Sequence, residues 1–148
     1  MLKNAPFSAR YVILTDSRFH TASAEIYHYS GDLRGHLVIM HSGDAWVLDG
    51  EELPSLAGCT DIDLEMSPVT NTIPIRRVAL KVGEKEDISA AWIRFPSLEI
   101  MPLKQSYERA SDNSYIYRSS NFSSEIEVDS TGMVKCYGNV WKEITPQS

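Results

Sequence analysis

The sequence predicts a single all-β domain whose strands form a strongly curved antiparallel sheet or a partly open barrel. Apolar residues alternate with polar ones along much of the chain, and β-branched and aromatic residues are concentrated in these stretches. Short clusters of Gly, Pro, Asp, Asn and Ser separate the stretches, as turns between strands require. No stretch of helical length carries apolar residues at positions i, i+3 and i+4, so we expect few or no long helices. The 148 residues correspond to one ordinary domain, and we assign residues 1–148 to it.

The first half of the chain contains five expected strands. Turn signals end several of them, for example Ser30-Gly31-Asp32 and Ser42-Gly43-Asp44. In order along the chain, the strands are Tyr11 to Thr15, Thr21 to Tyr29, Gly35 to His41, Trp46 to Leu48 and Thr60 to Met66.

The second half contains six more. Ser67-Pro68 separates them from the first five, because proline has no N–H to donate within a central strand. Ser130-Thr131-Gly132 predicts a hairpin turn with glycine in the left-handed conformation. Consecutive antiparallel strands with tight turns predict a meander that curls on itself. The expected strands are Thr72 to Val82, Ile88 to Phe95, Leu98 to Tyr107, Tyr115 to Ser119, Phe122 to Asp129 and Met133 to Ile144.

Polar side chains are unusually dense between Gly58 and Arg77. Asp61, Asp63 and Glu65 alternate with apolar residues, so in a strand the three acids share one face. This stretch has two interpretations: its polar groups line a ligand site, or they satisfy one another where an irregular strand crosses the sheet.

Three hydrogen-bonding residues and two cations complete the same stretch. Asn71 and Thr72 belong to a run of short polar side chains, which an Ile-Pro-Ile segment separates from Arg76 and Arg77. Because adjacent strand residues face oppositely, we expect only one of the two arginines to point inward.

The run from Gly58 to Leu80 resembles the GC-D-DL…SP-TNT-PIRR signature of the putative glycolipid-binding proteins, a bacterial family formerly known as a domain of unknown function. Further matches extend the resemblance over roughly Arg10 to Trp141. The resemblance implies a β-rich fold similar to that of bacterial lipoprotein carriers, with a cavity for a lipid or glycolipid. It also points to Gln105, Tyr107, Tyr117 and Arg118, although the two tyrosines have an alternative role as cross-strand partners.

The resemblance also indicates a domain that is short at its N-terminus, because family members usually carry more sequence ahead of Arg10. We therefore expect Tyr11 to Thr15 or Thr21 to Tyr29 to lie at a sheet edge. Either this edge pairs with a second copy of the chain, or the N-terminal segment folds back to cover it.

Composition excludes several classes of function. The net charge of -6 argues against nucleic-acid binding. The N-terminal segment lacks the apolar core of a signal peptide, and no apolar run approaches the ~18 residues of a membrane span, so we expect a cytoplasmic protein with no stable membrane insertion.

Cys59 and Cys136 are expected to be small core residues, with a bridge between them left open. The four histidines show no metal-ligand spacing and no cofactor fingerprint is present, so we assign no metal and no cofactor.

We therefore expect non-catalytic binding of an amphipathic small molecule, a glycolipid by the resemblance, and assign no catalytic residue. The expected ligand-binding residues are Asp61, Asp63, Asn71, Thr72, Arg76, Arg77, Gln105, Tyr107, Tyr117 and Arg118. One alternative is an enzyme of glycolipid or carbohydrate metabolism, because Asp61 and Asp63 would lie about 6.6 Å apart on one strand face, within the ~6.5–9.5 Å range of inverting glycosidases. Another alternative is an oligomeric scaffold that pairs through the N-terminal edge.

Overall fold

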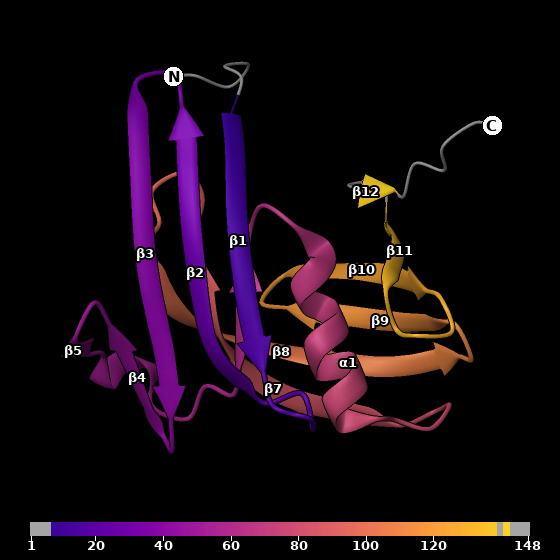
Figure 1. Ribbon diagram of the computed structural model, residues 1–148. Coiled ribbons are helices and arrows are strands. Elements are labelled where there is room, and N and C mark those ends of the chain that lie inside the picture. Colours follow the sequence, from indigo (N-terminus) through magenta and orange to yellow (C-terminus); the bar gives the residue numbers. More distant parts are fainter. Residues whose placement is uncertain (1–6, 139–140, 143–148) are drawn as a thin grey trace.

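The computed structural model describes residues 7–138 and 141–142, which form two β-sheets and one short α-helix. The first sheet contains five antiparallel strands in sequence order, so each strand pairs with the next. Its strands cross those of the second sheet and do not run alongside them (Figure 1). The five strands are β1 (Phe7–Thr15), β2 (Thr21–Ser30), β3 (Leu33–Ser42), β4 (Ala45–Leu48) and β5 (Glu51–Glu52).

The second sheet contains seven strands in the order β12-β11-β10-β9-β8-β7-β6. Every neighbouring pair is antiparallel except β6 and β7, which are parallel. Its strands are β6 (Asp61–Leu64), β7 (Lys85–Ile93), β8 (Ile100–Ser111), β9 (Ser114–Ser119), β10 (Phe122–Val128), β11 (Val134–Tyr137) and β12 (Trp141–Lys142). The predicted all-β class with a strongly curved sheet is confirmed.

The prediction of a strand over Thr72 to Val82 is wrong, because residues Thr72–Val78 form helix α1. A 3₁₀ turn, η2 (Pro68–Asn71), leads into it, and a second, η1 (Pro54–Leu56), precedes β6. Pro74 lies in the first turn of α1, where a backbone N–H has no partner within the helix and its absence has no cost. Ala79 ends the helix in a left-handed conformation with φ 51°.

Other predicted strands agree with the structure to within a few residues, with two differences. Met133 to Ile144 is not one strand, because β11 and β12 pair antiparallel and the chain must reverse between them; residues 139–140, 143 and 144 of that prediction lie outside the described part. The two-residue strand β5 was not predicted. The hairpin at residues 130–132 is confirmed, since β10 pairs with β11 and Gly132 has φ 87°.

The main apolar core lies between the two sheets. Ile26, Ile39 and Trp46 of the first sheet pack with Ile62 and Ile93 of the second, and each of the five side chains is at most 1% exposed. The Trp46 Nε1–H donates to the carbonyl oxygen of Cys59 at 3.0 Å, which connects the first sheet to the segment that precedes β6. Cys59 lies in this core as predicted, whereas Cys136 is half-buried, and both thiols are free.

A second core covers the opposite face of the second sheet. Ile75 and Leu80, in α1 and just after it, pack against Tyr107, Tyr117 and Ile126. Figure 1 shows α1 lying across β8 and β9. The second sheet is therefore covered on one face by the first sheet and on the other by α1.

The predicted edge is confirmed, because β1 forms the outer strand of the first sheet. Val12 and Leu14 project from it with exposed fractions of 60% and 57%. Among the described residues, no helix has the length and apolar character needed to cross a membrane.

Candidate functional site

A buried ion pair lies at the β6 edge of the second sheet. Asp61 is 1% exposed, and its Oδ2 accepts hydrogen bonds from the Arg77 guanidinium and from the Thr60 hydroxyl, the latter at 2.7 Å. Arg77 also donates to the Thr60 hydroxyl at 3.4 Å. Arg77, which comes from α1, therefore contacts both the first residue of β6 and the residue immediately before that strand.

Asp63 follows on the same face of β6 as Asp61, as the alternation predicted. Its carboxylate accepts a hydrogen bond from the Gln105 side-chain amide of β8. Burial raises the pKa of Asp63 to about 6, with a further contribution from Glu65, and the hydrogen bond from Gln105 opposes this shift. The group therefore changes charge close to neutral pH, whereas an ordinary aspartate does so near pH 4.

Asn71 connects the end of η2 to the centre of β8. Its Oδ1 accepts a hydrogen bond of 2.6 Å from the Tyr107 hydroxyl, and its amide donates to the carbonyl of Pro68 at 3.0 Å. Burial raises the pKa of Tyr107 well above its usual value, with smaller contributions from nearby acids and tyrosines. Tyr107 therefore remains a neutral hydrogen-bond donor, and the pair fixes the start of α1 against the sheet.

Thr72 and Arg76 hold α1 against the β10–β11 turn. The Thr72 hydroxyl donates to the carbonyl of Gly132 at 2.8 Å, and Arg76 donates to the carbonyl of Thr131 at 2.9 Å. A Cβ on Gly132 would lie 3.0 Å from Arg76 Cγ, so the absence of a side chain permits this close approach. The expectation that only one arginine points inward assumed a strand. In the helix, both arginines make contacts, in different directions.

A cavity of ≈ 780 Å³ lies between η2, the end of β6 and the β9–β10 turn; we call it the aromatic cavity. The rings of Tyr117, Phe122 and Tyr137 form one wall, with centroids 6.0 to 6.2 Å apart. Burial raises the pKa of Tyr117 to about 12, so this hydroxyl also stays neutral. The full lining comprises Asp63, Leu64, Glu65, Met66, Ser67, Pro68, Asn71, Trp92, Leu103, Tyr117, Ser119, Ser120, Asn121, Phe122 and Tyr137.

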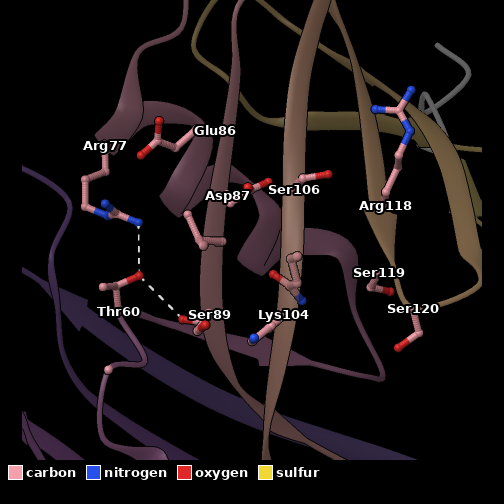
Figure 2. A pocket seen from close by; sticks show the side chains of 13 residues that line it. Thr60, Arg77, Glu86, Asp87, Ser89, Lys104, Ser106, Arg118, Ser119 and Ser120 are labelled. Carbon is pink, nitrogen blue, oxygen red and sulfur yellow. Dashed lines mark hydrogen bonds between the residues drawn. The ribbon is translucent and has the colours of Figure 1, made fainter.

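A second hollow of ≈ 670 Å³, the polar cleft, is lined mainly by hydroxyl and charged side chains (Figure 2). Its strand residues Ser89, Lys104 and Ser106 share the sheet face that packs, further along β7, against the first sheet. Ser119 and Ser120 line both hollows, which therefore adjoin at the β9–β10 turn. The cleft is lined by Gly58, Thr60, Arg77, Glu86, Asp87, Ile88, Ser89, Lys104, Gln105, Ser106, Arg118, Ser119 and Ser120.

The residues predicted from sequence divide into three groups. Asp63, Asn71 and Tyr117 line the aromatic cavity. Arg77, Gln105 and Arg118 line the polar cleft, where Arg118 pairs with Glu108 at 2.9 Å. The remaining four line neither hollow and hold neighbouring elements together through the hydrogen bonds described above; they are Asp61, Thr72, Arg76 and Tyr107.

Sequence reasoning missed several residues of both linings. Trp92, Leu103, Phe122 and Tyr137 are apolar or aromatic lining residues of the aromatic cavity, and Lys104 belongs to the polar cleft. Strand register was the signal that could have found two of them: Trp92 is the β7 partner of Asp63, and Leu103 lies two residues from Gln105 on the same face. Among the residues that the structure describes, His, Cys, Asp and Glu side chains form no group that could hold a metal ion.

Comparison with known proteins places the chain in a family. The family model described as putative glycolipid-binding matches residues 2–143. The chain belongs to this family. A crystal structure of a DUF1089 family protein from Pseudomonas aeruginosa is 32% identical, with a TM-score of 0.91, and the match covers 97% of this chain and 80% of that one. No curated protein matches the chain.

Proposed function

We propose that the protein binds an amphipathic ligand, a glycolipid as the family's description suggests, and holds the apolar part of that ligand in the aromatic cavity. The observation that carries the proposal is the cavity itself, which combines ≈ 780 Å³ with walls formed largely by Met, Pro, Leu and aromatic side chains. Ligand sites are typically hollows of about 300–1,000 Å³ with apolar walls and a few polar groups. Each methylene of a bound alkyl chain would gain about 0.8 kcal/mol on leaving water.

The polar groups of the cavity suit a ligand that also carries hydroxyls. Asp63 and Asn71 both line it, and both are held in place by hydrogen bonds from β8. A carboxyl group with a pKa of about 6 can accept a hydrogen bond when ionised and donate one when protonated. Fixed groups of this kind orient a ligand without forming covalent bonds to it.

The position of Asp61 favours binding over catalysis. The glycosidase alternative requires Asp61 and Asp63 to act as a pair across one substrate. Asp61 lines neither hollow, and its Oδ2 is engaged by Arg77 and Thr60. Two carboxyl groups that act as acid and base must both reach the scissile bond, and of the pair Asp61 and Asp63 only Asp63 borders the aromatic cavity.

Native mass spectrometry of freshly purified protein, before and after organic extraction, tests the proposal. We expect a bound species that extraction removes. Titration with octyl-β-glucoside below its micellar concentration should then change the fluorescence of Trp92, and Trp92→Phe should remove that signal.

A cavity-filling variant identifies the site. Leu103→Trp should weaken binding at least roughly tenfold by occupying the cavity. The control is Leu33→Trp, which introduces the same bulk at a position that is 59% exposed on β3. Equal binding by wild type and Leu103→Trp would contradict the proposal.

A further inference from the structure

Some polar side chains of the polar cleft have no bonding partner in the described part of the chain. Asp87, Lys104 and Ser120 are exposed and line it, yet their side chains form no hydrogen bond or ion pair with the described part of the chain. Figure 2 shows the side chains of Lys104 and Arg118 on β8 and the end of β9, with those of Ser119 and Ser120 close by. Free polar groups gathered in a hollow of ≈ 670 Å³ can contact a ligand without first breaking an internal bond.

Strand register arranges these groups in rows. Asp87 on β7 lies opposite Ser106 on β8, which lies opposite Arg118 on β9. In the next row, Ser89 lies opposite Lys104. An acceptor, a hydroxyl and a cationic donor thus follow one another across neighbouring strands, about 4.8 Å apart. Sugar hydroxyl groups, which both donate and accept hydrogen bonds, match such alternation.

The charges of the cleft favour a neutral ligand. Arg77 is paired with Asp61, and Arg118 is paired with Glu108. Of the charged lining residues, this leaves one cation, Lys104, and two acids, Glu86 and Asp87. A phosphate or sulfate would need a surplus of positive charge and would be repelled by the acids. An uncharged saccharide has no such requirement.

We propose that the polar cleft is a binding site for a neutral saccharide. Ser119 and Ser120 line both hollows. A ligand that crosses the β9–β10 turn can therefore place its apolar part in the aromatic cavity and its sugar in the cleft. That assignment of the sugar as the head group of the same ligand rests on the proposed function. Saccharide binding by the cleft alone does not.

Amide chemical shifts during titration of ¹⁵N-labelled protein test the inference. The probes are maltose, lactose and cellobiose, none of which has an apolar tail, and inorganic phosphate serves as the charged comparison. We expect at least one disaccharide to shift the amides of Lys104, Ser106 and Ser120 in a saturable manner, with phosphate producing smaller changes. Asp87→Asn and Lys104→Ala should each weaken binding by roughly tenfold through the loss of one charge-assisted hydrogen bond.

A lysine outside the cleft provides the matched control. Lys85→Ala removes an exposed lysine of β7 that does not line the cleft, and should leave saccharide affinity unchanged. Absence of shifts with every disaccharide, or stronger shifts with phosphate, would overturn the inference while leaving apolar ligand binding intact. In the converse outcome, octyl-β-glucoside leaves the fluorescence of Trp92 unchanged while a disaccharide still binds. That result would contradict the proposed function and support the saccharide site in the cleft.

Discussion

Asp63→Asn should stabilise the protein at neutral pH and not at acidic pH. The pKa of Asp63 is about 6 in the folded protein, against an ordinary 3.8, because burial disfavours the charged carboxylate. The folded protein therefore retains a proton that the unfolded chain has lost, and the free energy of unfolding falls as pH rises between these two values. A shift of about two units corresponds to roughly 3 kcal/mol at 1.36 kcal/mol per unit.

Asparagine has the same shape, remains neutral and can still accept the hydrogen bond from Gln105. At about pH 7.5 we expect the free energy of unfolding of the variant to exceed that of wild type by up to roughly 3 kcal/mol. The gain should shrink as pH falls and disappear below about pH 3, where both states of wild type carry the proton.

Urea unfolding at several pH values, followed by circular dichroism, measures this difference. Asp44→Asn, at an exposed turn, is the control for the loss of one negative charge. A difference between Asp63→Asn and wild type that does not change with pH would refute the reasoning.

Three further predictions concern other parts of the fold. Arg77→Met should reduce the free energy of unfolding by about 3–5 kcal/mol at neutral pH, because it leaves the buried Asp61 without its partner; an unchanged urea midpoint would show that the pair contributes nothing. Ala79→Gly should raise the thermal midpoint, with a gain of up to about 1 kcal/mol, since glycine adopts φ near 51° without the steric cost that alanine bears; a lower midpoint would contradict the left-handed helix end. Wild-type protein should self-associate through the β1 edge, and replacing both Val12 and Leu14 by lysine should abolish this in light scattering; a strictly monomeric wild type would disprove that contact.

Period-two patterns predicted most of the sheet because one face of each strand is buried. In β2, Ala24 and Ile26 are buried at alternate positions, as the apolar pattern of the sequence indicated, and the polar residue His28 continues the alternation. Short connections between consecutive strands then set the antiparallel order of the first sheet and of β7 to β11, with glycine in the β2–β3, β3–β4, β4–β5 and β10–β11 turns. These features depend on residues close in sequence, and a single sequence displays them.

The sequence did not predict helix α1, because several of its residues individually favour strands. Ile73, Ile75 and Val78 are β-branched, and Pro74 disfavours a helix interior. The helix is held by contacts with distant residues, among them the hydrogen bond between Thr72 and Gly132, sixty positions away in sequence. Local propensity gives no information about such a contact, so tertiary structure overrides it.

For the candidate site, the sequence predicted which side chains share a strand face, but not which residues they contact. Alternation correctly placed Asp61 and Asp63 on one face, but it could not assign their partners. Arg77 became the partner of Asp61 only because the intervening chain forms a helix, and Gln105 reaches Asp63 only because β8 pairs with β7. Six of the ten predicted residues line one of the two hollows and four line neither, a division that depends on helix α1 and on strand register.

The parallel pairing of β6 with β7 has a consequence for the order of folding. Residues 65–84, which include η2 and α1, must close as a loop before β6 can dock, whereas β7 to β10 can assemble from neighbouring hairpins. Because the entropy of loop closure opposes contacts between distant residues, we expect β6 to join the sheet last. Pulsed hydrogen exchange during refolding should protect β9 and β10 amides before that of Glu65, which bonds to Ile93. A newly made chain would then acquire its two hollows only in the final step of folding, after most of the sheet that supports them has formed.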